Sequence, residues 1–356
     1  MVNRIEKLMA DLPSDIDGAL IQAPENRFYF AGIQSSAGFL LVGREKAALY
    51  IDFRYYGKAT QVVPKPIEVV LLDDEPMQLA AFCRRQGIAR MGLEASCTLG
   101  QLARLRKNLP GVELVAESGL DQVINGQRRH KSDAEVAAIR EAQRITDLSF
   151  THILNYIRPG RSERDIALEL EMYSRRMGSE GPAFEFIVAS GPNSALPHAR
   201  AGSRIIERWD WITIDFGCTI EGYHSDMTRT VAVGGAAEEM RKIYHIVYVA
   251  QYEALRQMGP AKGLIEIDAV ARNMIADAGY GEYFGHSLGH GVGLEVHERP
   301  NLSPKTLGML DPGDVVTVEP GIYLPGRFGC RIEDMVLITD EGIENFTQSD
   351  KELLVI

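Results

Sequence analysis

Residues 211–230 indicate the fold and the chemistry most directly, and read Trp-Ile-Thr-Ile-Asp-Phe-Gly-Cys-Thr-Ile-Glu-Gly-Tyr-His-Ser-Asp-Met-Thr-Arg-Thr. Apolar residues alternate at Ile212, Ile214 and Phe216, and this period of two predicts a β-strand. Asp215 then points to the face opposite these three side chains. The stretch therefore predicts an apolar strand that presents a single carboxylate.

A second strand is predicted from about residue 223 to 233, and it carries Asp226. If the two strands form a hairpin centred between Ile220 and Glu221, Asp215 and Asp226 lie directly opposite each other. Their Cβ atoms would then be roughly 4.5–5.5 Å apart. Opposed like charges are unfavourable unless a cation lies between them. The hairpin therefore predicts one half of a divalent metal site.

The same pattern recurs near the C-terminus. An apolar run ends at Glu319, a turn rich in Pro and Gly follows, and a returning strand carries Glu333. Both glutamates are equally far from Gly326, so a hairpin centred there brings them opposite each other. A single carboxylate is more commonly a solvated surface acid. Two similarly built pairs on apolar strands instead favour a site for two metal ions.

Residues 285–298 read Gly-His-Ser-Leu-Gly-His-Gly-Val-Gly-Leu-Glu-Val-His-Glu. His286 and His290 have the i, i+4 spacing of helical zinc peptidases, but no Glu follows His286 and the glycines oppose a helix. The segment also lacks the Gly-Lys-Ser/Thr ending of a phosphate loop. The glycines fit a tight backbone that brings imidazoles close to a crowded centre.

Composition excludes several classes of protein. The 356 residues carry 38 Lys and Arg against 49 Asp and Glu, a formal net charge of −11, which argues against nucleic-acid and anionic membrane partners. The four cysteines are widely spaced and are expected to be reduced thiols. No apolar run approaches the ~18 residues of a membrane span, and the charged N-terminus differs from a signal peptide. We therefore expect a cytoplasmic protein.

The length and the pattern of elements indicate two domains. Helix and strand signals alternate through the first part of the chain, which predicts a small α/β domain over residues 1–127. A polar linker follows, and Ser132 with Glu135 forms a capping box that opens a helix. The second domain, residues 132–356, is predicted to be α+β, with helices flanking a largely antiparallel sheet. Further helical patterns begin at Ser162 and cover about 237–257 and 264–278.

Taken together, these motifs resemble the pita-bread metallopeptidases, in particular the branch of Xaa-Pro dipeptidase (prolidase) and aminopeptidase P. Ile-Asp-Phe-Gly, Ser-Asp-Met-Thr-Arg-Thr, the His- and Gly-rich segment, Val-Glu-Pro-Gly-Ile-Tyr and Arg-Ile-Glu-Asp occur in the order of the family. The resemblance covers nearly the whole chain. It implies an α+β catalytic domain of the pita-bread (creatinase/aminopeptidase) type after a smaller α/β domain of the creatinase/prolidase type.

The resemblance also implies two divalent metal ions per chain. By motif position the ligands are Asp215, Asp226, His290, Glu319 and Glu333. Asp226 and Glu333 match the bridging positions, Asp215 completes one ion, and His290 and Glu319 complete the other. This oxygen-rich set suits Mn²⁺ or Co²⁺ better than a thiolate-type zinc centre. Mn²⁺ is the expected ion, with Co²⁺ and Zn²⁺ as alternatives.

The activity implied by the resemblance is hydrolysis of Xaa-Pro bonds, in dipeptides or at peptide N-termini, by a hydroxide that bridges the metals. Glu319 would pass a proton to the leaving nitrogen, His297 would stabilise the oxyanion, and His198 would lie near the scissile bond. The positions that match substrate-binding residues are His286, Tyr323 and Arg331. Proline-containing peptides are the expected substrates, and a homodimer is the expected assembly.

Two other functions stay open: a methionine-aminopeptidase-like exopeptidase, and a metal-free pita-bread relative that acts as an amidinohydrolase or a binding module. All five ligand positions are filled, which argues against the metal-free reading. Glu185-Phe186 stands where Asp-Thr is common in the family. Asn301 follows Pro300, where some prolidases carry an Arg suited to gripping a dipeptide carboxylate. The choice between dipeptidase and aminopeptidase P therefore stays open.

Overall fold

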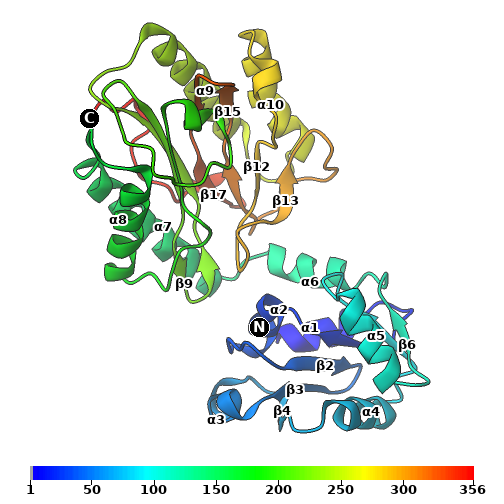
Figure 1. Ribbon diagram of the computed structural model, residues 1–356. Helices are drawn as coiled ribbons and strands as arrows, with labels where there is room; N and C mark the ends of the chain where they lie inside the picture. Colours follow the sequence, from blue (N-terminus) through cyan, green and yellow to red (C-terminus); the bar gives the residue numbers. More distant parts are fainter. Residues whose placement is uncertain (1–2) are drawn as a thin grey trace. The chain divides into compact units, whose positions relative to one another are not determined.

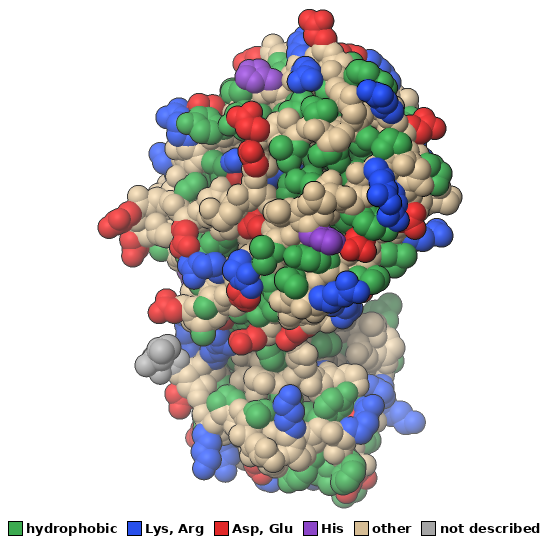
Figure 2. Space-filling model, turned by 90° about the vertical axis from the view of Figure 1, so that its left-hand side faces the viewer, with side chains coloured by type: hydrophobic (Ala, Val, Ile, Leu, Met, Phe, Trp, Pro, Cys, Tyr) green, Lys and Arg blue, Asp and Glu red, His purple; other side chains and the backbone are tan. Residues whose placement is uncertain are grey.

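The computed structural model describes residues 3–356 and divides into two compact units (Figure 1). The first unit ends at Arg128 and the second begins at Arg129. None of the helices within residues 3–356 is both long and apolar enough to cross a membrane. Acidic and basic side chains are interspersed on the face drawn in Figure 2.

The N-terminal unit is built on a six-stranded mixed sheet in the order β4-β3-β2-β1-β5-β6. β1 and β3 pair with β2 in antiparallel fashion, and the outer pairs are parallel. The three central strands are buried along their whole length, as expected where a sheet is covered on both faces. The predicted α/β class of this unit is thereby confirmed.

The elements of this unit are α1 (Arg4–Asp11), β1 (Gly18–Ile21), α2 (Pro24–Ala31), β2 (Phe39–Gly43), β3 (Ala47–Ile51), α3 (Phe53–Val62), β4 (Glu68–Leu71), α4 (Glu75–Gln86), β5 (Arg90–Leu93), α5 (Leu99–Asn108), β6 (Glu113–Val115) and α6 (Leu120–Arg129).

The elements of the C-terminal unit are α7 (Asp133–Leu154), α8 (Glu163–Arg176), β7 (Ile187–Ser190), η1 (Gly191–Ala195), β8 (Trp211–Phe216), β9 (Thr219–Ile220), β10 (Tyr223–His224), β11 (Met227–Ala232), α9 (Glu238–Gln257), α10 (Leu264–Asp277), η2 (Gly281–Tyr283), β12 (Gly289–Gly291), β13 (Glu298–Leu302), β14 (Val315–Val318), β15 (Gly321–Leu324), β16 (Phe328–Arg331), β17 (Asp334–Ile338) and β18 (Ile343–Asn345).

Two antiparallel sheets organise this second unit, and each is covered by a pair of helices. The sheet β11-β8-β7 shares an apolar core with α7 and α8, whereas β13-β12-β14-β17-β18 shares one with α9 and α10. The strands lie between the two helix pairs (Figure 1). The prediction of an α+β domain with flanking helices and antiparallel strands is confirmed.

The predicted helix starts are confirmed at both capping boxes. The backbone N–H of Ser132 donates to the Glu135 carboxylate at 2.8 Å, and α7 begins at the next residue. The Ser162 N–H donates to Asp165 at 2.8 Å, while the Asp165 N–H donates to the Ser162 hydroxyl at 3.1 Å. These contacts satisfy N–H groups that the first turn of a helix leaves unpaired.

The predicted register of the first hairpin is wrong. Tyr223 pairs with Ile220, so the turn consists of Glu221 and Gly222, and Asp215 lies opposite Thr228 instead of Asp226. Both turn residues have positive φ, 50° and 76°, the backbone of a two-residue type I′ turn. The predicted single strand is also interrupted, because Asp226 lies between β10 and β11. Asp226 is therefore a diagonal neighbour of Asp215.

The second hairpin has the predicted register. Gly321 pairs with Arg331 and Leu324 with Phe328, which places the centre of the turn at Gly326. Gly326 has a φ of +71°, a backbone conformation that glycine adopts at little cost. The neighbouring strands continue the same register, because Val318 pairs with Asp334.

Candidate metal centre

The five predicted metal ligands line one cavity of about 700 Å³ in the C-terminal unit. Two of them lie in strands, Asp215 in β8 and His290 in β12. The other three lie next to strand ends: Asp226 between β10 and β11, Glu319 directly after β14, and Glu333 between β16 and β17. Strand ladders therefore hold each ligand or the residues beside it, which limits the movement of the five side chains before a metal ion binds.

Three of the five ligands already surround one position. One ligand atom from each of Asp226, His290 and Glu333 lies within 4.8 Å of the other two. His290 Nε2 is 3.6 Å from Asp226 Oδ2 and 3.3 Å from Glu319 Oε1. Asp215 instead accepts a hydrogen bond of 2.6 Å from Arg331 Nη2. The arrangement offers one nearly formed cation position, with Asp215 and Glu319 as further donors beside it.

Unpaired carboxylate oxygens indicate that a cation fits here. Within residues 3–356, the Oδ1 atoms of Asp215 and Asp226 are buried and have no hydrogen-bond partner. Buried polar atoms in proteins are nearly always paired, so each orphan calls for an explanation. Oxygen donors of this kind are the usual ligands of Mn²⁺ and similar hard cations. The residues present therefore fit a divalent metal ion.

The electrostatics of the cavity favour the same conclusion. Burial, together with the neighbouring carboxylates, raises the pKa values of Asp226 and Glu333 well above their ordinary range. Burial also raises the pKa of Asp215, although Arg331 opposes that shift. Holding several negative charges out of water is unfavourable, and a bound cation would relieve that repulsion.

Glu319 behaves differently because it contacts an imidazole. Burial opposes its ionisation, but the hydrogen bond and charge of His290, together with the charges of His286 and Arg331, outweigh burial and lower the pKa of Glu319 to about 2. The other ring nitrogen of His290, Nδ1, lies 3.1 Å from the Gly291 carbonyl oxygen and can donate to it. That contact leaves Nε2 to face the carboxylates, the orientation that a metal-binding histidine needs.

Glycines allow the His290 strand to approach its neighbours closely, as the sequence predicted. A Cβ atom on Gly289 would lie 1.9 Å from the Thr317 carbonyl oxygen, and one on Gly291 would lie 2.4 Å from that of Arg299. Both distances are well inside van der Waals contact. The strand β12 therefore needs glycine on either side of its histidine.

The three predicted substrate-binding residues form a chain of hydrogen bonds. Arg331 Nη1 donates to the Tyr323 hydroxyl at 2.7 Å, and that hydroxyl is 3.0 Å from His286 Nε2. His286 and Arg331 line the cavity, whereas Tyr323 lies buried behind them. Arg331 also donates to Asp215 and Thr228. Its guanidinium is therefore hydrogen-bonded to other side chains of this protein. The arrangement orients Asp215 and the His286 ring.

The other two predicted catalytic histidines lie at the cavity wall. His198 and His297 both line the cavity, and the rings of His297 and His290 have centroids 4.3 Å apart. Burial, followed by the charges of His290 and His198, lowers the pKa of His297. A neutral ring carries one N–H, which suits a hydrogen-bond donor.

The sequence reasoning missed the residues that support Glu333. The Thr228 hydroxyl donates to Glu333 Oε2 at 2.7 Å and accepts from Arg331 Nε at 3.0 Å. Thr228 lies two residues after Asp226, so the alternation of a strand was a signal that placed both on one face. A threonine that holds a ligand carboxylate fixes the direction of its free oxygen.

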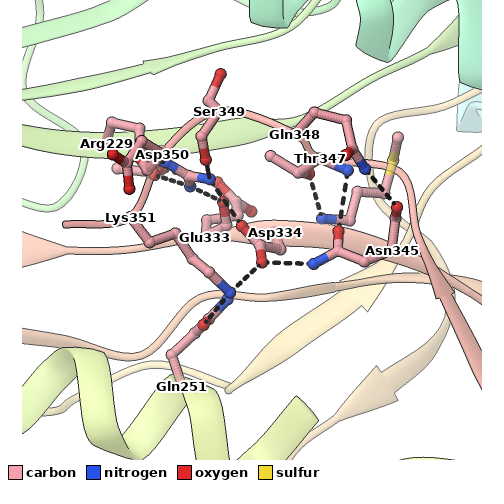
Figure 3. Close-up of polar contacts among 12 residues, drawn as sticks. Arg229, Gln251, Glu333, Asp334, Asn345, Thr347, Gln348, Ser349, Asp350 and Lys351 are labelled. Atoms are coloured by element: carbon pink, nitrogen blue, oxygen red, sulfur yellow. Dashed lines mark hydrogen bonds and ion pairs between the residues drawn. The ribbon is translucent and has the colours of Figure 1, made fainter.

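A buried ionic cluster holds the backbone of Glu333 (Figure 3). Arg229 donates to the Glu333 carbonyl oxygen and pairs with Asp334 at 2.9 Å. Asp334 also pairs with Lys351 Nζ at 2.7 Å and accepts from Asn345 at 2.7 Å. Arg229 and Asp334 are almost completely buried. No spacing rule connects residues this far apart in sequence, so only the folded chain identifies the cluster.

Comparison with known proteins places the chain among peptidases. Residues 137–340 match the model of metallopeptidase family M24, and residues 1–130 match that of the creatinase/prolidase N-terminal domain. An Xaa-Pro dipeptidase of Pyrococcus horikoshii is 38% identical over 99% of either chain. The solved Xaa-Pro dipeptidase of Bacillus anthracis is 39% identical, with a TM-score of 0.95 over 99% of either chain. An X-Pro aminopeptidase structure from Thermotoga maritima is 36% identical, with a TM-score of 0.90 over 99% of this chain and 100% of that one.

Proposed function

This chain belongs to metallopeptidase family M24, and we propose that it is a metal-dependent exopeptidase that hydrolyses Xaa-Pro bonds in dipeptides or at peptide N-termini. The observation that carries the proposal is the convergence of four carboxylates and one imidazole in a single cavity. Relatives that match over their full length are named for the cleavage of Xaa-Pro bonds, which supports the substrate class.

The cofactor is proposed to be two divalent cations, with Mn²⁺ as the first choice and Co²⁺ or Zn²⁺ as alternatives. Asp226 and Glu333 would contact both ions, Asp215 would complete one, and His290 with Glu319 would complete the other. Such ions, when bound, activate water near neutral pH and polarise the scissile carbonyl group. The raised pKa values of Asp226 and Glu333 support cation binding at the same place.

Side chains that line the cavity would carry out proton transfer, oxyanion stabilisation and substrate positioning. Glu319, next to His290, would accept a proton from the attacking water and pass it to the departing proline nitrogen. His297 would donate a hydrogen bond to the oxyanion, and His198 would contact the substrate near the scissile bond. Arg331 would keep Asp215 in place through the ion pair that joins them.

The cavity wall also suits proline. Apolar side chains line it next to the metal ligands, namely Phe184, Ile187, Pro197 and Val296. The Xaa-Pro bond is a tertiary amide without an N–H, so a peptidase cannot recognise it through that donor. An apolar surface that contacts the pyrrolidine ring supplies recognition instead.

The proposal is tested by removing metal with a chelator, adding Mn²⁺ back, and following four substrates side by side. We expect hydrolysis of Ala-Pro, of Ala-Pro-Ala or of both, to depend on Mn²⁺ and to exceed that of Met-Ala-Ser and of creatine. Preferential cleavage of Met-Ala-Ser would support a methionine aminopeptidase. Cleavage of creatine without metal would support an amidinohydrolase. The ratio of dipeptide to tripeptide hydrolysis separates dipeptidase from aminopeptidase P.

His297→Ala is expected to retain the metal content of the wild type and to lose mainly the chemical step. Loss of one oxyanion donor typically lowers kcat about 10²–10³-fold. Metal content by elemental analysis and kcat for Ala-Pro measure the two effects separately. His245→Ala, an exposed histidine on α9, is the matched control. Loss of metal in His297→Ala would contradict the proposed role.

Assembly and location complete the proposal. We propose a homodimer, because the family resemblance implies that assembly, and a cytoplasmic location, because all four cysteines are free thiols. Light scattering on the purified full chain measures the mass directly, and a value of one chain would contradict the dimer.

A further inference from the structure

Arg200 and Arg331 are the only Arg or Lys residues among those described as lining the cavity. Arg331 is buried, and its guanidinium donates to Asp215, Tyr323 and Thr228. Arg200 is different, because its side chain is 84% exposed and its ion pair with Glu185 spans 3.5 Å. An exposed ion pair of this kind contributes little to stability, because water screens both charges. Arg200 is therefore the cation of this cavity that a ligand can engage.

The backbone holds Arg200 near the metal ligands. Ile187 pairs directly with Asp215 in the antiparallel ladder of β7 and β8. Ala199 is buried and packs in one small cluster with Ile187. This contact anchors the loop that carries His198 on one side and Arg200 on the other, and both line the cavity. Arg200 therefore lines the same cavity as Ile187 and Asp215.

We propose that Arg200 binds the free carboxylate of the proline residue in an Xaa-Pro dipeptide and so makes this enzyme prefer dipeptides. The assignment rests on the proposed function above. The carboxylate of such a dipeptide is separated from the scissile nitrogen by a single carbon, so it lies close to the metal ligands during reaction. We place the pyrrolidine ring against Ile187 and Pro197, which line the same cavity as Arg200, and the carboxylate against the Arg200 guanidinium. An arginine can hold it through two parallel hydrogen bonds.

Asn301 and Glu185 strengthen this assignment. Asn301, which also lines the cavity, carries no charge, so it does not compete as a cationic partner. Glu185 is 70% exposed and competes with the substrate for Arg200. A substrate carboxylate that displaces Glu185 gains a charge-assisted contact, whereas a neutral amide gains much less.

The test compares Ala-Pro with its carboxamide, Ala-Pro-NH₂, in the Mn²⁺-loaded full-length enzyme. Arg200→Gln is expected to lower kcat/KM for Ala-Pro roughly 10- to 100-fold, the effect of losing a hydrogen bond between charged groups. The change should lie in KM, because the contact is made equally in the ground state and the transition state. For Ala-Pro-NH₂ the same variant should stay within about twofold of wild type. Arg200→Lys should fall between the two enzymes for Ala-Pro, because it keeps the charge but loses the paired geometry.

Two further variants make the result specific. Arg176→Gln removes an exposed arginine from α8 and should leave both substrates unchanged. Glu185→Gln should lower KM for Ala-Pro up to about fivefold, because it removes the competing carboxylate. Equal losses for both substrates in Arg200→Gln, or no loss for either, would overturn the assignment.

A binding measurement distinguishes failure of this inference from failure of the proposed function. Calorimetric titration with L-proline and with L-prolinamide needs no turnover. We expect wild type to bind L-proline more tightly than L-prolinamide, and Arg200→Gln to lose that preference. If the preference persists in the variant, Arg200 does not bind the carboxylate. If neither Ala-Pro nor Ala-Pro-Ala is cleaved, the proposed function fails while the titration still reports on Arg200.

Discussion

Glu333→Gln is expected to abolish metal binding and turnover while making the metal-free protein more stable. Glu333 is proposed to contact both ions, so the neutral amide should remove a charge that both require. Metal ions contribute several kcal/mol to the transition state, so kcat should fall about 10³-fold or more. Thr228 can still donate to the amide oxygen of the glutamine, which preserves the local packing.

The gain in stability follows from the buried charge. Burial, then the charges of Glu319 and Asp215, raise the pKa of Glu333, so ionisation at neutral pH disfavours the folded metal-free state. A raised folded-state pKa means that the contribution of Glu333 to stability is greatest below the ordinary glutamate pKa of about 4.3 and is lost as pH rises through the folded-state pKa. Glu333→Gln has no such charge and should gain roughly 1–3 kcal/mol at neutral pH.

Elemental analysis, kcat for Ala-Pro, and thermal unfolding with and without Mn²⁺ measure these effects. Wild type should gain stability with Mn²⁺, because a ligand that binds only the folded state stabilises it. Glu333→Gln should show no such gain. Glu341→Gln, an exposed glutamate in the same unit, serves as control. Two bound ions in Glu333→Gln would refute the bridging role.

The second large effect is expected for Asp334→Asn. Asp334 is buried between Arg229 and Lys351, both within 3 Å of its oxygens, and these cations hold its pKa below the ordinary value despite burial. Removing the charge leaves two cations without their carboxylate, and breaking a buried ion pair typically costs about 3–5 kcal/mol. For a unit of this size that corresponds to a decrease in Tm of roughly 10 °C.

The same substitution should also weaken metal binding. Arg229 donates to the Glu333 carbonyl oxygen, so disturbing the cluster moves a ligand (Figure 3). Outer residues of this kind typically change metal affinity about 10- to 100-fold. Titration with Mn²⁺ below the unfolding temperature measures that effect. Asp340→Asn, on the exposed side of the chain after β17, is the control. A Tm within about 2 °C of wild type would show that the cluster contributes little.

Much of the fold could be predicted from local patterns. The capping boxes at Ser132 and Ser162 marked two helix starts, because a polar side chain there pairs with N–H groups that the helix leaves unpaired. The second hairpin was predicted with its register, since Gly326 occupies a turn position with positive φ. The register of the first hairpin was not predicted correctly. Its turn is formed by Glu221 and Gly222, so its centre lies one residue later than predicted, and the alternation of apolar residues does not specify this position.

The candidate metal centre could be predicted only in part from such local patterns. Carboxylates on apolar strands and glycines around His290 are visible in the printed sequence, because buried charge and close backbone approach need special residue types. The occupation of Arg331 by Asp215 and Tyr323 is not visible, since it depends on which strands become neighbours. Arg200 gave no signal at all, because an arginine in a loop is most often a solvated surface residue.

Local sequence patterns thus predict where strands and helices lie, which strands carry the paired acids, and where the histidine strand lies. Hydrophobic periodicity, turn residues and helix caps each act over a few neighbouring residues. The contacts that give these residues their chemistry are set by long-range packing. Asp226, His290 and Glu333 are far apart in the sequence but lie close together in the fold, and Arg200 lines the same cavity next to Ala199, which packs with Ile187. Such contacts join residues distant in the chain, and their energies exist only once the two sheets have formed.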